Sequence, residues 1–246
     1  MANKVEKGAK SLKSVKSQAS KGGKVAATKK SPTTEIRKRN YTKVKLQVRA
    51  KAILTFDDGL ADMSGNLGDS LSLILSTLDK HGIRAHFYLT GTEVVAHPTW
   101  AKLIVTRGHF VENHGWNHEK HGALAESTIK NKLERAQSAI VTATGKSPRR
   151  FRPPEGDGIH AAELRAACKA LGLIPTYWDV DTNDWKNKNG GLVRLKFVPR
   201  IHQWKSEYST KGHPLDILMH VLDNTARDLN DLINEMKSDG WSFTTY

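Results

Sequence analysis

Short apolar segments alternate with amphipathic segments along the chain from about residue 48 onward. The apolar segments predict strands at residues 52–56, 84–91, 109–113, 149–154, 173–181, 215–220 and 241–246. Helical periodicity, with a glycine or proline at several boundaries, predicts helices at 70–82, 98–108, 125–145, 160–172, 191–204 and 224–240. Strands that alternate with helices indicate parallel βαβ units, so the predicted class is α/β, in a barrel or a doubly wound sheet.

Polar side chains stand where these predicted strands end. They are Asp57 and Asp58, His114, Arg152, Asp181 and His220. In parallel α/β folds the functional residues gather at the carboxyl ends of the strands. We therefore expect these side chains to share one rim of the sheet.

The adjacent acids of "KAILTFDDGL" allow a simpler interpretation. Asp-Asp-Gly is good turn chemistry, because Asp bonds its own backbone and Gly accepts positive φ. On this segment alone a solvated turn is the favoured interpretation. Polar residues at five strand ends weaken it and favour a chemical role for Asp57 and Asp58.

Three histidines lie within eight residues in "NHGWNHEKH": His114, His118 and His121. The spacing of His114 and His118 is i, i+4, which places both imidazoles on one face if the segment is helical. Two histidines and a carboxylate suit Zn²⁺, Fe²⁺ or Co²⁺. The segment lacks the glutamate of the HExxH motif, and His121 could replace His118 as the ligand.

A metal site would explain the paired aspartates. One carboxylate would complete the site with two histidines, and its neighbour could take a proton from the metal-bound water. The cation would offset the repulsion between the two charges.

The charge of the chain is concentrated at its beginning. Residues 1–45 hold 14 Lys and Arg against 2 Asp and Glu, a net charge of +12, whereas the whole chain of 246 residues carries +14. The first 40 residues contain no aromatic side chain, so we predict a disordered Lys-rich tail at 1–45 and a catalytic domain at 46–246. The tail would bind a polyanion, such as nucleic acid or an acidic polymer, or act only as a solubilising arm.

The sequence offers no targeting signal that we recognise. No apolar h-region of a signal peptide stands near the start, and no apolar run reaches membrane-spanning length. Cys168 is the single cysteine, which excludes an intrachain disulfide. The default expectation is therefore a cytoplasmic protein without a membrane span.

Five short motifs resemble those of the polysaccharide deacetylase family, also described as the NodB homology domain and carbohydrate esterase family 4. The resemblance covers about residues 50–246. "TFDDG" is similar to the first motif and implies Asp57 as catalytic base and Asp58 as metal ligand. "NHGWNH" is similar to the second and implies His114 and His118 as the other ligands.

The remaining motifs imply the rest of the site. "RFRPPEG" resembles the third motif, in which Arg152 would hold Asp57. "DVDTNDW" is similar to the fourth and implies Asp181 as partner of the catalytic histidine and Trp185 as a groove wall. "ILMH" resembles the fifth, with Leu218 lining the acetyl pocket and His220 as general acid.

The resemblance implies a distorted (β/α) barrel that removes N-acetyl groups from an N-acetylglucosamine-containing polysaccharide such as chitin or peptidoglycan. The implied cofactor is a divalent metal, with Zn²⁺ expected first and Co²⁺ as the alternative. Gly115 and Glu155 depart from the motifs, which usually have Ser or Thr and Tyr there. The Glu155 backbone N–H would still serve the oxyanion hole. A deacylase for another O-acetyl or amide substrate and a non-catalytic polymer-binding protein remain as alternatives.

Overall fold

This computed structural model describes residues 50–60, 69–186 and 193–246. Within these residues the strands form one sheet, and every strand pair is parallel. Its strand order is β5-β4-β3-β2-β1-β7-β6, with β8 paired to β1. This is the half-barrel form of the predicted α/β barrel. The predicted tail at 1–45 lies outside the described residues.

Each strand overlaps a predicted apolar segment, and several strands are shorter than predicted. Their bounds are β1 Lys51–Asp58, β2 His86–Leu89, β3 Phe110–Asn113, β4 Arg150–Phe151, β5 Ile174–Pro175, β6 Val180–Asp181, β7 Leu215–His220 and β8 Ser242–Phe243. The helices are α1 Asp69–His81, α2 Gly91–Ala96, α3 Pro98–Thr106, α4 Glu126–Thr144, α5 Ala162–Ala170, α6 Val193–Lys211 and α7 Asp223–Ser238. Two short 3₁₀ helices, Pro154–Gly156 and Asp184–Lys186, follow β4 and β6. The short helix α2 was not predicted, because six residues carry little periodicity.

The prediction of one strand at 173–181 was wrong. This segment forms two short strands, β5 and β6, which lie at opposite ends of the sheet. β5 pairs with β4, whereas β6 pairs with β7. Residues 176–179 therefore cross from one edge of the sheet to the other. An apolar run cannot distinguish a continuous strand from a crossing of this kind, because both bury apolar side chains.

Strand β1 separates a helix-packed core from a polar interior. Leu54 and Phe56 belong to the main apolar cluster, and Phe56 stacks on Phe87 with 4.9 Å between ring centroids. Burying one such ring stabilises the fold by about 1.5–3 kcal/mol. Thr55 and Asp57 alternate with these residues and hydrogen-bond to Arg152 on the other face.

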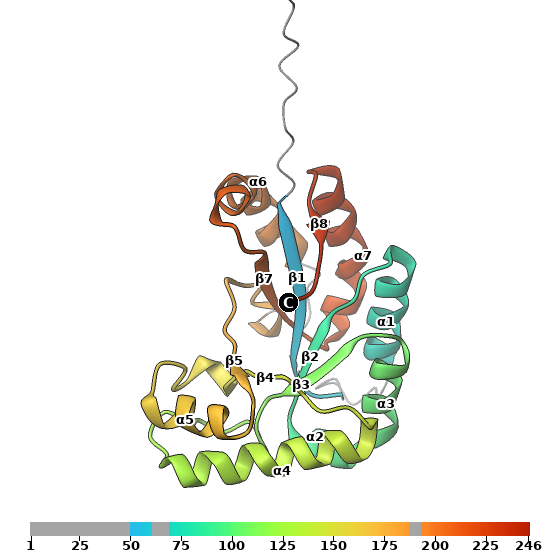
Figure 1. The fold of residues 1–246 in the computed structure, drawn as a ribbon. Coiled ribbons are helices and arrows are strands. Elements are labelled where there is room, and N and C mark those ends of the chain that lie inside the picture. Colours follow the sequence, from blue (N-terminus) through green and yellow to red (C-terminus); the bar gives the residue numbers. More distant parts are fainter. Residues whose placement is uncertain (1–49, 61–68, 187–192) are drawn as a thin grey trace, which may run out of the picture. The chain divides into compact units, whose positions relative to one another are not determined.

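Helices pack around the sheet, and two of them, α3 and α4, begin or end at a proline or a glycine. Figure 1 shows α1, α3 and α7 beside the strands and α4 crossing below them. Helix α3 begins at Pro98, whose missing N–H costs nothing at that position. Helix α4 ends at Gly145, whose φ of 72° is a left-handed conformation that glycine adopts without strain.

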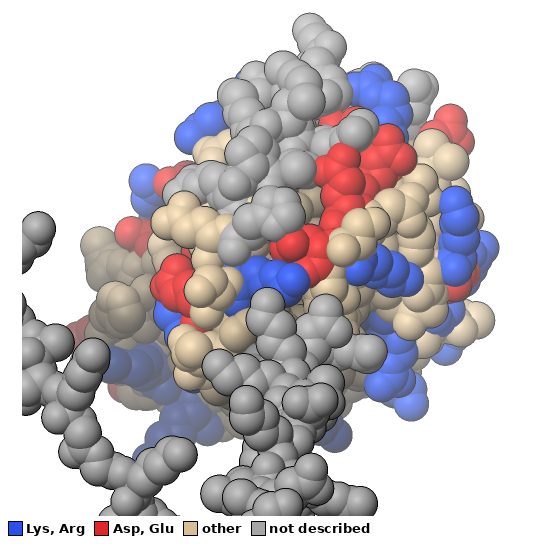
Figure 2. Space-filling model, turned by 90° about the horizontal axis from the view of Figure 1, so that it is seen from above, with Lys and Arg blue, Asp and Glu red and all other residues tan. Residues whose placement is uncertain are grey.

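Both signs of charge are present on the surface in Figure 2, where Lys and Arg are interspersed with Asp and Glu. This mixture agrees with the small net charge that the sequence leaves outside residues 1–45. Among the described residues, no helix is long and apolar enough to cross a membrane.

Candidate active site

The strand register brings the predicted rim residues together. Asp57 of β1 is paired with His220 of β7 on one side and with Tyr88 of β2 on the other. His114 directly follows β3, and its backbone N–H bonds the carbonyl of Leu89 at the end of β2. Parallel pairing in this register places the ends of the strands at one edge, as the sequence predicted.

Asp58, His114 and His118 form a compact cluster of metal-ligand atoms. Asp58 Oδ1 lies 3.2 Å from Nε2 of each histidine, and all three ligand atoms lie within 4.8 Å of one another. Burial opposes ionisation of Asp58, but the adjacent imidazoles of His114 and His118 hold its pKa well below the usual range. The predicted ligand set is therefore assembled in space.

A hydrogen bond behind the cluster orients His114. Its Nδ1–H donates to the backbone carbonyl of Arg152 at 2.7 Å, so Nε2 is the free nitrogen and points toward Asp58. Metal-binding histidines commonly use the second ring nitrogen in this way, which fixes the tautomer and the ring orientation.

His121 is not part of the cluster. Its ring is fully buried, lies against Phe151 and has no hydrogen-bond partner in the described part of the chain. A Cβ atom at Gly115 would approach its Cε1 to 3.1 Å, and Gly115 has a φ of 86°. The departure at Gly115 thus has a steric reason, because the His121 ring occupies the adjacent space.

Asp57 is held by a buried arginine, as the resemblance implies. Arg152 is fully buried, and its Nη1 donates to Asp57 Oδ1 at 2.7 Å. Burial opposes the charge on Arg152, but the carboxylates of Asp57 and Asp216 raise its pKa well above the usual value. The guanidinium therefore stays ionised and fixes the orientation of Asp57.

The predicted partner of His220 was wrong. Nδ1 of His220 lies 2.7 Å from Asp184 Oδ1, not near Asp181. Asp181 ends β6, and its carboxylate accepts the backbone N–H of Asn183 instead. Asp184 begins the 3₁₀ helix after this turn and accepts the His220 backbone N–H and the Thr225 hydroxyl, each at 2.7 Å.

The sequence could not make this choice. Two aspartates stand three residues apart in the same motif, and only the turn decides which one reaches β7. Burial lowers the pKa of His220, but the hydrogen bond and charge of Asp184, with help from Asp58, raise it to about 9. Its Nε2 faces the metal-ligand cluster, 3.8 Å from Asp58 Oδ2.

The three predicted substrate-binding residues differ in exposure. The Trp185 side chain is 46% exposed, with Lys186 Nζ 4.7 Å from its ring centroid. Leu218 is buried in β7, two residues before His220. Glu155 has a φ of 55°, and its carboxylate pairs with Lys120 at the surface, 2.8 Å away.

Asp216 was missed by the sequence analysis. It lies in β7, is 5% exposed, and accepts hydrogen bonds from Arg152 Nη2 at 3.0 and 3.1 Å. A signal was available, because Asp216, Leu218 and His220 are spaced i, i+2, i+4 and share one face of the strand.

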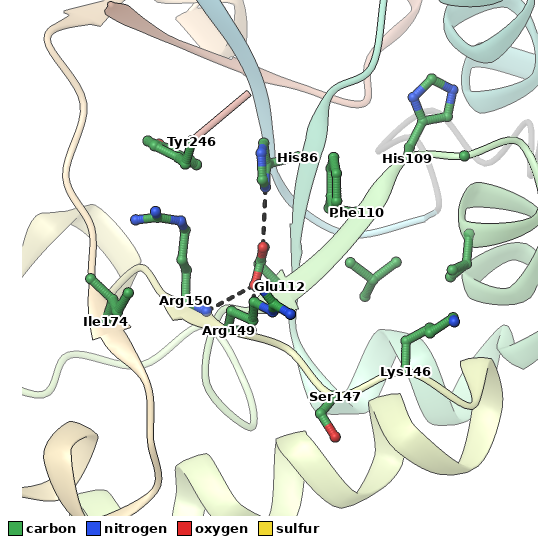
Figure 3. Close-up of a pocket in the computed structure, with 13 residues that line it drawn as sticks. His86, His109, Phe110, Glu112, Lys146, Ser147, Arg149, Arg150, Ile174 and Tyr246 are labelled. Carbon is green, nitrogen blue, oxygen red and sulfur yellow. Dashed lines mark hydrogen bonds and ion pairs between the residues drawn. The ribbon is translucent and has the colours of Figure 1, made fainter. Parts of the chain in front are cut away.

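A cavity lies at the amino ends of the strands, at the opposite edge of the sheet from the candidate site. It has a volume of about 690 Å³ and is shown in Figure 3. His86 Nδ1 lies 3.1 Å from Glu112 Oε1, and Glu112 Oε2 accepts the backbone N–H groups of Arg149 and Arg150 at 2.8 Å. None of the predicted site residues lines this cavity.

Comparison with known proteins tests the resemblance. The family described as polysaccharide deacetylase matches residues 47–175, just over half of the chain. This chain belongs to the polysaccharide deacetylase family. The match includes the segments that carry Asp57, Asp58, His114 and His118 and ends before Asp184 and His220.

Individual members of the polysaccharide deacetylase family match most of this chain. The peptidoglycan-N-acetylglucosamine deacetylase PgdA of Listeria monocytogenes is 31% identical over 202 residues, 82% of this chain and 39% of that protein. This chain thus spans about two fifths of the length of that relative. A family 4 carbohydrate esterase from Streptomyces lividans, solved with acetate, matches with a TM-score of 0.66 and 27% identity, over 80% of this chain and 92% of that chain.

A further neighbour cautions against inferring activity from the fold. A CE4 family pseudoenzyme from Bacillus anthracis matches with a TM-score of 0.66 and 29% identity, over 79% of this chain and 63% of that chain. A fold does not by itself supply an activity. The activity of this chain must therefore be argued from its own residues.

Proposed function

We propose that this protein is a metal-dependent N-deacetylase for a polysaccharide or oligosaccharide that contains N-acetylglucosamine, of the peptidoglycan or chitin type. One arrangement carries the proposal. The Asp58, His114 and His118 ligand atoms lie within 4.8 Å of one another, between an arginine-bound Asp57 and an aspartate-bound His220. Base, metal ligands and acid are thus all present at one edge of the sheet.

The donor set fits a divalent metal. One carboxylate oxygen and two imidazole nitrogens are ligands that Zn²⁺ and Co²⁺ accept, and such a set leaves positions for water and substrate. The hydrogen bond from His114 Nδ1 to the Arg152 carbonyl supports this assignment. When bound, the metal would lower the pKa of its water and polarise the acetyl carbonyl.

The protein's own groups would move the protons. Asp57 would take a proton from the attacking water, and its bond to Arg152 fixes the direction of the carboxylate. His220 would give a proton to the departing amine, and Asp184 holds the imidazole in the correct tautomer. The Glu155 backbone N–H would stabilise the negative charge on the acetyl oxygen.

The substrate would lie across the edge of the sheet that contains these groups. The exposed face of Trp185 would stack on a sugar ring, and Leu218 would contact the acetyl methyl group. The PgdA relative is named for peptidoglycan, and another relative, 36% identical over 156 residues, is named chitin deacetylase 1 from Saccharomyces cerevisiae. These names support N-acetylglucosamine polymers as the substrate class.

Acetate release would test the proposal. The metal-stripped protein would be assayed on N-acetylglucosamine oligomers and on peptidoglycan, with and without added Zn²⁺ or Co²⁺. We expect metal-dependent release, which Asp57→Asn would reduce by about 10²–10⁴-fold. Bound metal without release from either substrate would contradict this substrate class, and equal release by Asp57→Asn would contradict the assigned base.

A further inference from the structure

Arg152 is shared between two carboxylates from two different strands. Its Nη1 bonds Asp57 of β1 at 2.7 Å, and its Nη2 bonds both oxygens of Asp216 of β7 at 3.0 and 3.1 Å. All three side chains are buried. One carboxylate would be enough to neutralise the guanidinium, and a second buried charge is costly. A local role for Asp216 would explain why the site contains it.

The hydrogen bonds that orient the guanidinium of Arg152 are made by its Nη atoms. Within the described part of the chain, Nε of Arg152 has no hydrogen-bond partner. The guanidinium is a rigid planar fork, so fixing the Nη2 end also fixes the direction of Nη1. Asp216 and the Tyr177 carbonyl, 3.2 Å away, hold that Nη2 end.

Asp216 is itself fixed by neighbours. The hydroxyl of Tyr246 donates to Asp216 Oδ2, and the Thr55 hydroxyl lies 3.0 Å from Asp216 Oδ1. The Tyr246 ring is fixed in turn, because the Arg150 guanidinium lies 3.7 Å from its centroid and the His86 ring lies 4.7 Å away. Figure 3 shows these two residues beside Tyr246 at the cavity at the amino ends of the strands.

We propose that Asp216 is a positioning residue that, together with Tyr246, aims Arg152 at Asp57. The chain of contacts runs from Tyr246 through Asp216 to Arg152 and then to the proposed base. This inference rests on the proposed function. Its two new members touch neither the metal ligands nor the space beside them, so they act on the base alone.

Three variants test the contacts one by one. Asp216→Asn keeps the size of the side chain and removes its charge. Tyr246→Phe removes only the hydroxyl, and the double variant removes both. Thr106→Val is the control, because it also removes a hydroxyl from an exposed residue, and that hydroxyl bonds the Lys102 carbonyl within α3 at 2.9 Å, apart from Asp216 and Arg152.

The kinetic test separates positioning from general damage. For Asp216→Asn we expect kcat to fall about 10–100-fold, because a small displacement of a catalytic group has that effect. KM and the Zn²⁺ affinity, measured by competition with a chelating dye, should stay within about threefold. For Tyr246→Phe we expect a loss in kcat of about fivefold, the equivalent of one hydrogen bond, and for Thr106→Val no change.

The double variant makes the test sharper. In the proposed chain of contacts Tyr246 acts through Asp216, so adding Tyr246→Phe to Asp216→Asn should reduce kcat no further. Additive losses would overturn the proposed chain of contacts. Parallel losses in kcat, KM and metal affinity for Asp216→Asn would also overturn it, because they indicate a structural role.

A structural readout keeps this inference separate from the proposed function. In a crystal structure of Asp216→Asn, we expect Nη1 of Arg152 to move out of hydrogen-bond distance of Asp57. An unmoved Arg152 would overturn the inference even if the unmodified protein is an active deacetylase. A displaced Arg152 would support it even if the unmodified protein releases no acetate, an outcome that would count against the proposed function alone.

Discussion

The two edges of the sheet each contain a histidine paired with a buried carboxylate. At the carboxyl edge His220 lies 2.7 Å from Asp184, and at the amino edge His86 lies 3.1 Å from Glu112. In both pairs the second carboxylate oxygen accepts backbone N–H groups. As local arrangements the two pairs are nearly equivalent.

The surroundings of the free ring nitrogen distinguish them. Nε2 of His220 faces Asp58 and the metal-ligand cluster. The His86 ring is instead stacked on Phe110 and packed against Tyr246, and its Nε2 has no partner among the described residues. A histidine–carboxylate pair can transfer a proton only where the second nitrogen reaches a reacting group. We therefore assign chemistry to the first pair and a structural role to the second.

Removing the metal should produce the largest difference between the two edges. We expect chelation, or Asp58→Ala, to abolish acetate release, because the ligand cluster is the source of activated water. Glu112→Gln, at the amino edge, should leave the Zn²⁺ affinity unchanged. Atomic absorption after dialysis, together with an acetate assay, measures both. Undiminished release from a fully metal-free protein would contradict the assignment.

The next largest effect on activity is expected from replacing one of the two histidines. His220→Ala should lower kcat by about 10²–10⁴-fold, because the departing amine loses its proton donor. His86→Ala, the matched change at the amino edge, should lower kcat by about fivefold at most, because His86 reaches the site only through its packing against Tyr246. Circular dichroism checks that this variant folds. Equal losses in both variants would remove the distinction between the pairs.

The pH profile sharpens the comparison. As the proposed general acid, His220 would donate a proton only when it is protonated, so activity should fall as the pH rises through its pKa of about 9. Asp184→Asn removes the bond and charge that raise this pKa, and the alkaline limb of kcat against pH should move to lower pH. Glu112→Gln should leave that limb in place. An alkaline limb that does not move in Asp184→Asn would contradict the role of Asp184.

At the amino edge we expect substitution to lower the stability of the fold. Glu112 is buried and bonds two backbone N–H groups and a histidine. Glu112→Gln should lower the free energy of unfolding by about 1–3 kcal/mol, because the replaced oxygen leaves buried donors without partners. Urea denaturation measures this loss. An unchanged midpoint would show that the pair contributes nothing to stability.

The smallest expected effect concerns substrate choice. Glu155→Tyr removes a negative charge near the proposed site and should increase kcat/KM for acidic oligosaccharides relative to neutral ones by a few-fold. Lys120 pairs with Glu155 at the surface, so its charge screens part of the effect. Parallel assays on neutral and acidic substrates measure the ratio. An unchanged ratio would indicate that Glu155 does not face the substrate.

Local patterns were enough to predict most of this fold. The apolar run of β1 and the periodicity of α1 and α4 appear in the structure within a few residues of their predicted bounds. The spacing of the aspartates and histidines predicted a cluster of metal-ligand side chains, and the family resemblance identified its members as Asp58, His114 and His118. These features depend on neighbours in sequence or on the rule that parallel strands end at one edge.

Tertiary structure alone decided the rest. Asp184 and not Asp181 reaches His220, because a turn that follows β6 rotates one carboxylate toward β7 and uses the other to bond Asn183. Asp216 meets Arg152 because β7 lies beside β1, where Thr55 and Asp216 bond across 161 residues of sequence, a pairing that no local pattern records. The sequence determined which chemical groups are available at the rim. The packing of distant strands determined which of them touch, because a hydrogen bond depends on distances of tenths of an ångström that sequence spacing does not specify.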